Sequence, residues 1–250
     1  MRGFEAAGAF GCAVVAVLTV QSTRGLVTAR ALPSAEVEAA ANEVLVGQRV
    51  RAIKVGALGS RANVVAVAKL LREHGDVPSI VDTPMLPTRG RASLLDARAV
   101  DALKRELLPA ATLVTVNALE AETLTGDRVA TTRDARRAAK ALVAAGARAV
   151  LVKAGHLRGA EAVDVLAVGD ELFEIAAPRL RIEPVHGAGC TLAALIAARL
   201  ATVPLSSLVD AVRWAKRVHH EALAHALDVG GPLRVLTFPR GQATRSVVVR

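Results

Sequence analysis

Apolar and polar positions along the chain form two repeating patterns: short continuous apolar runs, and longer stretches in which apolar residues recur with helical spacing. The short runs predict buried strands at residues 13–20, 52–55, 79–82, 113–116 and 149–153. The longer stretches predict helices at residues 34–46, 60–73, 95–107, 132–144, 190–201 and 206–227. Gly169 and Asp170 separate two further short runs, 163–168 and 172–175, and predict a β-hairpin.

The strands and helices alternate along the chain with short connections, and the strand runs are apolar on both faces. This order is typical of an α/β fold with a mainly parallel central sheet and helices on both faces. In such sheets, ligands bind beyond the carboxyl ends of the strands. Polar residues that end or directly follow predicted strands are therefore candidate site residues, namely Gln21, Lys54, Asp82, Asn117 and Lys153.

A glycine-rich segment stands directly before the predicted helix at 190–201, and it reads His186-Gly187-Ala188-Gly189-Cys190-Thr191-Leu192. The first turn of a helix carries unpaired N–H groups and the positive end of the helix dipole, so this segment is a candidate anion site. We expect the same position to stabilise the thiolate of Cys190 and lower its pKa, which makes this side chain a candidate base or nucleophile. The combination favours phosphate chemistry. A cysteine that only packs is the alternative.

Composition and charge narrow the class of partner. The chain has 250 residues, of which 52% are hydrophobic, and this length fits one large α/β domain with a sizeable core. Aromatic residues make up 2%, Tyr is absent, and basic residues are scattered through the helical segments instead of forming a block. We therefore expect the net charge of +9 to attract small anionic substrates, and we expect no nucleic-acid partner.

The two cysteines, Cys12 and Cys190, have neither the spacing of a metal site nor that of a disulfide framework, which favours a reduced, cytoplasmic compartment. Residues 6–20 are almost wholly apolar, but this run is too short to span a membrane. Glu5 and Arg24 fit a signal peptide poorly. A buried strand inside the sheet is the better interpretation, and we expect no membrane partner.

Several short motifs resemble those of one enzyme family. The glycine-rich segment around Cys190 resembles the His-Gly-Thr-Gly-Cys-Thr-Leu signature of hydroxymethylpyrimidine/phosphomethylpyrimidine kinases, which act in thiamine biosynthesis and belong to the ribokinase-like superfamily. Other motifs of the family are matched in unbroken order, by Gln21-Ser22-Thr23-Arg24-Gly25, Lys54-Val55-Gly56-Ala57-Leu58, Asn117-Ala118-Leu119-Glu120-Ala121-Glu122 and Val152-Lys153-Ala154-Gly155-His156. The resemblance runs over residues 4–236 and implies a single ribokinase-like kinase domain, followed by a tail at 237–250.

The resemblance implies ATP- and Mg²⁺-dependent phosphorylation of hydroxymethylpyrimidine and of its monophosphate. The backbone amides of Gly187, Ala188 and Gly189 are implied to hold the transferred phosphoryl group. Cys190 is implied to take the proton from the substrate hydroxyl, and Lys153 to neutralise the nucleotide phosphates. For Lys153, an exposed lysine at the edge of the sheet is the simpler alternative.

Five further residues receive roles from the resemblance. Asn117 is implied to bind the nucleotide, while Glu120 and Asp82 organise Mg²⁺ through water. Gln21 and Ala57 are implied to line the pyrimidine pocket, where Ala57 replaces a methionine of the family. Simpler structural roles stay open: a helix cap for Glu120, a turn cap for Asp82 and a surface strand end for Gln21.

Members of the family have a first strand and a glycine-rich segment ahead of the point where this sequence begins, so we expect an N-terminally incomplete domain with an unpaired apolar edge. Two alternatives to the main function are a pyridoxal-type kinase with a pocket enlarged at Ala57, and a non-catalytic small-molecule-binding relative. The resemblance also implies a homodimer. No catalytic or metal-binding role is assigned to five of the six histidines, namely His156, His186, His219, His220 and His225.

Overall fold

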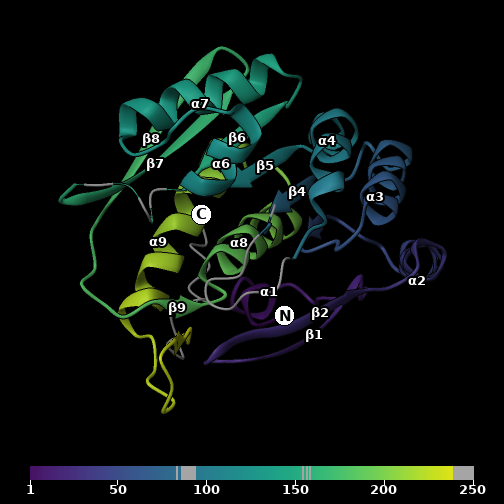
Figure 1. Ribbon diagram of the computed structural model, residues 1–250, viewed down its shortest axis with the longest axis horizontal. Coiled ribbons are helices and arrows are strands. Elements are labelled where there is room, and N and C mark those ends of the chain that lie inside the picture. The colour runs from purple at the N-terminus through teal and green to yellow at the C-terminus, as the bar shows by residue number, and fades with distance from the viewer. Residues whose placement is uncertain (83, 86–93, 154, 156, 158, 239–250) are drawn as a thin grey trace, which may run out of the picture.

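The computed structural model describes residues 1–82, 84–85, 94–153, 155, 157 and 159–238 (Figure 1). Within this part of the chain, the centre is a six-stranded sheet with the order β3-β4-β5-β6-β7-β8. Strands β3 (Ile53–Val55), β4 (Ser79–Asp82), β5 (Leu113–Val116) and β6 (Ala149–Val152) are parallel, and β7 (Glu161–Val168) and β8 (Glu171–Pro178) add an antiparallel hairpin at one edge. The strands predicted at 52–55, 79–82, 113–116 and 149–153, and the hairpin around Gly169, are confirmed.

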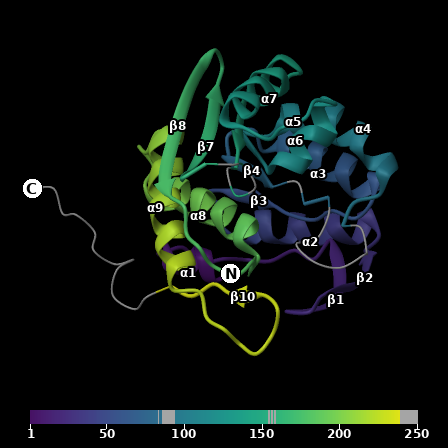
Figure 2. The same ribbon diagram turned by 60° about the vertical axis from the view of Figure 1, so that its left-hand side comes forward.

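Helices cover both faces of this sheet (Figure 2). On one face lie α3 (Arg61–Glu73), α6 (Ala118–Thr125) and α7 (Thr132–Ala144), with α2 (Ser34–Gly47) packed against α3. On the other face lie α1 (Arg2–Ala6), α8 (Ala188–Thr202) and α9 (Leu208–Ala224). The helices predicted at 34–46, 60–73, 132–144, 190–201 and 206–227 are confirmed, with ends shifted by up to three residues.

Alternate residues of the central strands enter two separate hydrophobic cores. Val81 of β4 and Val114 of β5 pack with side chains of α3 and α7. Their neighbours Ile80 and Leu113 pack with α8 and α9 on the opposite face. All four side chains are essentially inaccessible to solvent. Because both faces are covered, the strands read as continuous apolar runs in the sequence.

The prediction of a buried strand at residues 13–20 is wrong. The strand in this region is β1 (Val17–Ser22), which pairs in antiparallel fashion with β2 (Gly25–Ala31) in a separate two-stranded sheet. This β1–β2 hairpin lies apart from the six-stranded sheet, at the lower side of the molecule in both views (Figures 1 and 2). Leu18, Val20 and Val27 are exposed on it. A short apolar run does not by itself reveal whether its two faces are covered, and that ambiguity caused the error.

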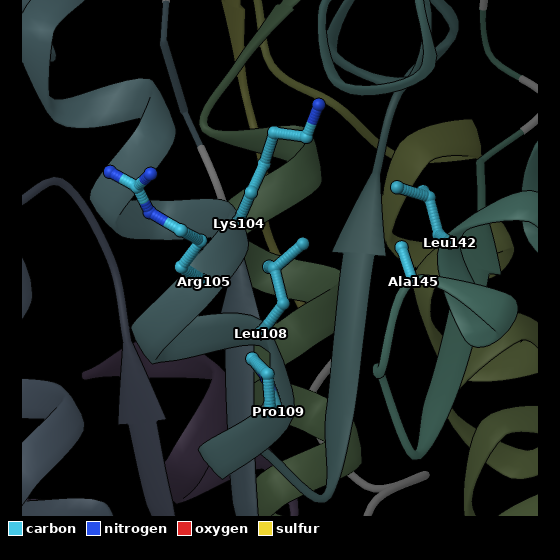
Figure 3. A pocket seen from close by; sticks show the side chains of 6 residues that line it. All are labelled: Lys104, Arg105, Leu108, Pro109, Leu142 and Ala145. Carbon is cyan, nitrogen blue, oxygen red and sulfur yellow. The ribbon is translucent and has the colours of Figure 1, made fainter.

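The single helix predicted at 95–107 is replaced by a segment of changing helical pitch. It contains a 3-10 turn (Ala97–Ala99), α4 (Val100–Ala102), a π-helical turn (Leu103–Leu107) and α5 (Leu108–Ala110). Pro109 has no N–H to donate, and its ring excludes the carbonyl four residues earlier, which favours a widened turn at this point. A cavity of about 340 Å³ opens between this segment and the end of α7 (Figure 3). Its lining residues are Lys104, Arg105, Leu108, Pro109, Leu142 and Ala145.

A short two-stranded sheet joins the glycine-rich segment to a segment near the end of the described residues. Strands β9 (Val185–His186) and β10 (Arg234–Val235) pair in parallel at the start of this segment.

Ala154, His156 and residues 239–250 of the expected tail lie outside the described residues. Among the helices of the described part, none is both long and apolar enough to cross a membrane.

Candidate active site

Asp82 is the centre of a cluster of charged and polar side chains beyond the carboxyl ends of the parallel strands. It ends β4 and is 2% exposed. Its Oδ1 accepts hydrogen bonds from Lys153 Nζ at 2.7 Å and from Thr115 Oγ1 at 2.9 Å. Its Oδ2 lies 4.0 Å from Lys54 Nζ. The four residues meet because parallel strands β3 to β6 bring their carboxyl ends to the same edge of the sheet.

Both members of the Asp82–Lys153 pair are charged at neutral pH. Burial alone would raise the pKa of Asp82, but the ammonium groups of Lys153 and Lys54 hold that pKa at about 2. Burial would likewise lower the pKa of Lys153, but the carboxylates of Asp82 and Glu120 keep it above its ordinary value. An exposed edge lysine at 153 is therefore wrong, because this side chain is buried in the ion pair with Asp82.

Asn117 and Glu120 form a capping box at the start of α6, which the sequence analysis did not place as a helix. Glu120 Oε2 accepts a hydrogen bond from the Asn117 backbone N–H at 2.8 Å, and Asn117 Oδ1 accepts one from the Glu120 N–H at 2.9 Å. The helix-cap role left open for Glu120 is thus confirmed. Burial raises the pKa of Glu120 to about 7, although the charge of Lys153 opposes this shift. A neighbouring cation would stabilise the charged form of this buried carboxyl group.

The glycine-rich segment lies against the ion pair. Gly187 has a φ of +73°, a left-handed conformation that favours glycine, and α8 begins at the next residue. The carbonyl of Gly187 accepts hydrogen bonds from Thr191 N–H and from Thr191 Oγ1, each at 2.9 Å. A β-carbon on Gly189 would lie 3.1 Å from Lys153 Nζ, so the lysine reaches the loop because this residue has no side chain. The first amides of α8 and the Lys153 ammonium thus lie side by side.

The expectation of a lowered pKa for Cys190 is wrong. Packing of protein atoms around its thiol raises the pKa to about 11. The negative charge of Asp82 adds to this shift, and the positive charges of Lys54 and Lys153 oppose it. Cys190 nevertheless remains accessible to solvent on one side. At neutral pH it is a thiol at the start of α8 that faces both solvent and the buried carboxylate.

The two residues expected to contact the pyrimidine lie in different settings. Gln21 is exposed on β1, as the surface alternative anticipated, and its Nε2 donates a hydrogen bond to Nε2 of His186 at 3.1 Å. This contact brings the β1–β2 hairpin to the start of the glycine-rich segment. Ala57 is half-buried in the segment after β3, next to Gly56, whose lack of a side chain leaves room for Lys54 Nζ.

Sequence reasoning gave no role to Thr115 or His219. Thr115 is the one hydroxyl in the apolar run of β5, and this exception to the pattern could have signalled its hydrogen bond to Asp82. His219 lies on α9, and its Nε2 is 2.8 Å from the Ala188 carbonyl of the glycine-rich segment. No local sequence pattern indicates that contact. Among the described residues, no group of three His, Cys, Asp or Glu side chains is placed to hold a metal ion directly.

Comparison with known proteins connects this geometry to one family. The family model described as Phosphomethylpyrimidine kinase matches residues 1–235. A hydroxymethylpyrimidine/phosphomethylpyrimidine kinase of Rhizobium meliloti (strain 1021) is 40% identical over 234 residues, which cover 92% of this chain and 86% of that protein. A solved phosphomethylpyrimidine kinase from Clostridium difficile 630 matches with a TM-score of 0.75 and 27% identity, covering 89% of this chain and 90% of that chain.

A Bacillus subtilis pyridoxal kinase, solved as a complex with ADP, matches with a TM-score of 0.85 over 95% of this chain and 89% of that chain. At 24% identity, this likeness speaks for the fold alone. The expected ribokinase-like α/β fold is confirmed by these structural matches. The family model and the 40% identical relative together show that the chain belongs to the hydroxymethylpyrimidine/phosphomethylpyrimidine kinase family.

Proposed function

We propose that this chain transfers the γ-phosphoryl group of ATP to hydroxymethylpyrimidine and then to its monophosphate. The observation that carries the proposal is the convergence of Lys153, the first amides of α8 and Cys190 at the carboxyl edge of the sheet, in a member of this kinase family. Phosphoryl transfer needs positioning and charge neutralisation more than covalent chemistry from the protein, and these groups supply both.

In the proposed reaction, the backbone amides of Gly187, Ala188 and Gly189 hold the transferred phosphoryl group, with the dipole of α8 behind them. Lys153 neutralises the nucleotide phosphates, and Asn117 contributes to the nucleotide site. In the first transfer, the substrate hydroxyl oxygen forms a bond to the γ-phosphorus, and the bond from that phosphorus to the bridging oxygen breaks and releases ADP. The hydroxyl proton passes to Sγ of Cys190. In the second transfer, an oxygen of the monophosphate takes the place of the hydroxyl oxygen.

The pKa of about 11 makes this base scarce at neutral pH, since roughly 10⁻⁴ of the unliganded chains carry the thiolate at pH 7. Turnover that uses Cys190 as the base is therefore proportional to this small thiolate fraction. We expect kcat/KM to rise about tenfold per pH unit between pH 7 and 10, because this parameter reports the protonation state of the free enzyme.

Mg²⁺ is part of the proposal, and the two candidate carboxylates fit it unequally. Both oxygens of Asp82 are already engaged by positive or hydrogen-bonding partners, namely Lys153, Thr115 and Lys54. Glu120 is buried, has a raised pKa and faces the same edge, so its carboxylate gains most from a nearby cation. Mg²⁺ retains its water readily, so both residues fit a water-mediated role, with Glu120 the stronger candidate. When bound, the ion would reduce the negative charge of the phosphates.

Gln21 and Ala57 are proposed to contact the aminopyrimidine. The side-chain amide of Gln21 both donates and accepts hydrogen bonds, as an aminopyrimidine edge requires. The half-buried methyl group of Ala57 leaves more room than the methionine of the family. Because a larger pocket could accept a different ring, a pyridoxal-type kinase activity is the second candidate function. A binding-only relative is the third possibility, and one assay with all three candidate substrates separates these functions.

The remaining parts of the proposal concern the setting of the enzyme. The kinase domain is proposed to span residues 4–236, which agrees with the match of the family model to residues 1–235. Both cysteines are free thiols, which suits the cytoplasm. A homodimer is proposed from the family resemblance, and the exposed apolar side chains of the β1–β2 hairpin, Leu18, Val20 and Val27, are compatible with it.

The test replaces Cys190 and follows ADP release with hydroxymethylpyrimidine, its monophosphate and pyridoxal. For Cys190→Ala we expect kcat to fall about 10²- to 10⁴-fold and the alkaline rise of kcat/KM to disappear, with ATP affinity by calorimetry unchanged within about twofold. Cys12→Ala is the matched control, because Cys12 is also an exposed free thiol. An equal fall in turnover and ATP affinity, or no fall at all, would show that Cys190 is not the base.

A further inference from the structure

A buried histidine lies directly behind the glycine-rich segment. His219, on α9, is 8% exposed, and its Nε2 is 2.8 Å from the carbonyl oxygen of Ala188. The two residues are 31 positions apart in the sequence, so the contact joins α9 to the first turn of α8. The contact follows from the packing of α8 against α9, which are neighbouring helices on the same face of the sheet.

The protonation state of this imidazole is fixed by its surroundings. Burial lowers the pKa of His219 to about 4, and the positive charges of Lys216, Lys153 and His220 act in the same direction, against the hydrogen bond to Ala188. The ring is therefore neutral at physiological pH. A carbonyl oxygen can only accept a hydrogen bond, so the hydrogen of the neutral ring is on Nε2 and is donated to Ala188.

This hydrogen bond determines the direction of an amide in the loop. The carbonyl of Ala188 and the N–H of Gly189 belong to one planar trans peptide, so they point in opposite directions. With the Ala188 carbonyl held toward α9, the Gly189 N–H points away from α9. Gly189 is also the residue whose open side faces Lys153 Nζ. The preceding peptide is held similarly, since Thr191 Oγ1 donates to the Gly187 carbonyl at 2.9 Å.

The position of His219 is itself secured against the sheet. Lys216 precedes it by three residues on α9 and therefore lies on the same side of that helix. Lys216 Nζ is 2.8 Å from Oδ2 of Asp164 on β7, and both side chains are largely buried. This ion pair joins α9 to the sheet one turn before His219. The helix that carries the imidazole is thus fixed independently of the loop.

We propose that His219 is a positioning residue for phosphoryl transfer: its neutral imidazole donates to the Ala188 carbonyl and thereby directs the Gly189 N–H toward the transferred phosphoryl group. This inference rests on the proposed function of the glycine-rich segment as the phosphoryl site. It adds a residue from α9 that touches neither substrate nor nucleotide. The role requires an N–H donor at the position of Nε2, and a ring as such is not required.

The experiment compares three substitutions that differ in that donor. His219→Gln places an amide N–H close to the position of Nε2, His219→Asn has the same chemistry but is one methylene shorter, and His219→Met removes the donor. We expect kcat to fall about 10- to 100-fold in His219→Asn and His219→Met and to stay within about threefold of wild type in His219→Gln. The KM for ATP should change less than kcat in every variant, because the amide contact strengthens in the transition state.

A second readout reports on the loop directly. Inhibition by ADP with aluminium fluoride, a mimic of the transferring phosphoryl group, should weaken in His219→Asn by about the factor lost in kcat, while inhibition by ADP alone stays unchanged. His220→Met is the matched control, because His220 is the next residue on α9 and its Nε2 contacts the exposed Pro178 carbonyl at 2.9 Å. That variant should keep wild-type kcat.

Specific outcomes overturn the inference. If His219→Gln and His219→Asn lose equal activity at equal thermal midpoints, or if His219→Asn keeps wild-type kcat, the donor does not position the loop. If wild type phosphorylates none of the three substrates, the proposed function fails instead. The Gln and Asn variants keep the polarity of the site, so their comparison stands even if His219→Met does not fold.

Discussion

The two parts of the candidate site are held in place by different kinds of interaction. The part at the end of the sheet consists of buried charges, with Asp82 and Lys153 in contact at 2.7 Å and Glu120 in a capping box. The part on the β1–β2 hairpin is exposed, and its link to the loop is the 3.1 Å hydrogen bond between Gln21 and His186. The proposed phosphate chemistry thus lies in the rigid part, and the proposed recognition of the pyrimidine ring lies in the accessible part.

The hairpin is fixed mainly at its two ends. At its base, the buried amide of Asn63 donates to the carbonyls of Leu32 at 3.1 Å and Ala16 at 3.4 Å, which flank the two strands. At its turn, the side chain of Thr23 fills the space that a β-carbon on Gly231 would occupy. A segment with few buried contacts between its ends can open locally without unfolding the sheet. We therefore expect substitutions in the hairpin to change binding of the pyrimidine ring, and substitutions at the end of the sheet to change phosphate chemistry.

The largest expected effect comes from Lys153→Met, which breaks the buried ion pair. Removal of one partner leaves Asp82 buried with only part of its compensation, and such changes cost about 3–5 kcal/mol in the free energy of unfolding. ATP affinity should fall at least tenfold, because the point charge beside the first amides of α8 is lost. Urea unfolding and calorimetric titration of a non-hydrolysable ATP analogue measure the two effects.

The matched control is Lys69→Met, the same substitution in an exposed pair. Lys69 Nζ lies 3.8 Å from Glu73 Oε1 on the surface of α3, and such pairs contribute less than about 0.5 kcal/mol. An unchanged ATP affinity in Lys153→Met would remove the lysine from the nucleotide site. A stability loss no greater than in Lys69→Met would show that the buried pair does not hold this part of the site together.

An intermediate effect is expected from Gly59→Ala at the base of the hairpin. Gly59 has a φ of +74°, and a β-carbon there would lie 2.7 Å from Ala31 Cβ and 3.0 Å from Val17 Cγ2. The substitution combines backbone strain with a clash, at a cost of about 1–3 kcal/mol, and should displace the hairpin. We expect the KM for hydroxymethylpyrimidine to rise about tenfold with ATP affinity unchanged, as measured by steady-state kinetics.

Gly169→Ala is the control for the strain alone. Gly169 has a φ of +54° in the β7–β8 turn, and a β-carbon there would meet nothing within 4 Å. It should lower stability by about 1 kcal/mol and leave both kinetic constants unchanged. An additional loss of ATP affinity in Gly59→Ala would mean that the hairpin and the charged part of the site are mechanically coupled, and it would contradict their independent response.

The sequence predicted the rigid part better than the accessible part, for a physical reason. Asp82 and Lys153 end strands that are covered on both faces, so the apolar runs locate them within one residue. The run at residues 13–20 is similarly apolar, but the single strand that pairs with β1 among the described residues is β2, and pairing is not encoded in a local pattern. The raised pKa of Cys190 also depends on Asp82, 108 positions earlier in the sequence, which the local sequence at the start of α8 does not reveal. Long-range contacts therefore account for each of these errors.

The smallest expected effect is the response of wild-type stability to pH between 4.5 and 6.5. Burial lowers the pKa of His219 from 6.5 to about 4, so its contribution is present above pH 6.5 and is lost as the pH falls through 4. Burial raises the pKa of Glu120 from 4.5 to about 7, so its contribution is present below pH 4.5 and is lost as the pH rises through 7. The two slopes are opposite in this window, and we expect these groups to change the free energy of unfolding by less than about 1 kcal/mol in total.

Single substitutions should reveal each slope in urea unfolding of the metal-free chain. Relative to wild type, His219→Gln should gain stability as the pH falls from 6.5 to 4.5, and Glu120→Gln should lose it, by about 1 kcal/mol per pH unit in each case. The hairpin variant Gly59→Ala should instead run parallel to wild type, because it leaves both buried groups in place. Parallel curves for all four proteins would contradict the burial of His219 and Glu120 as titrating groups and, with it, the distinction between a charged, buried part of the site and an exposed one.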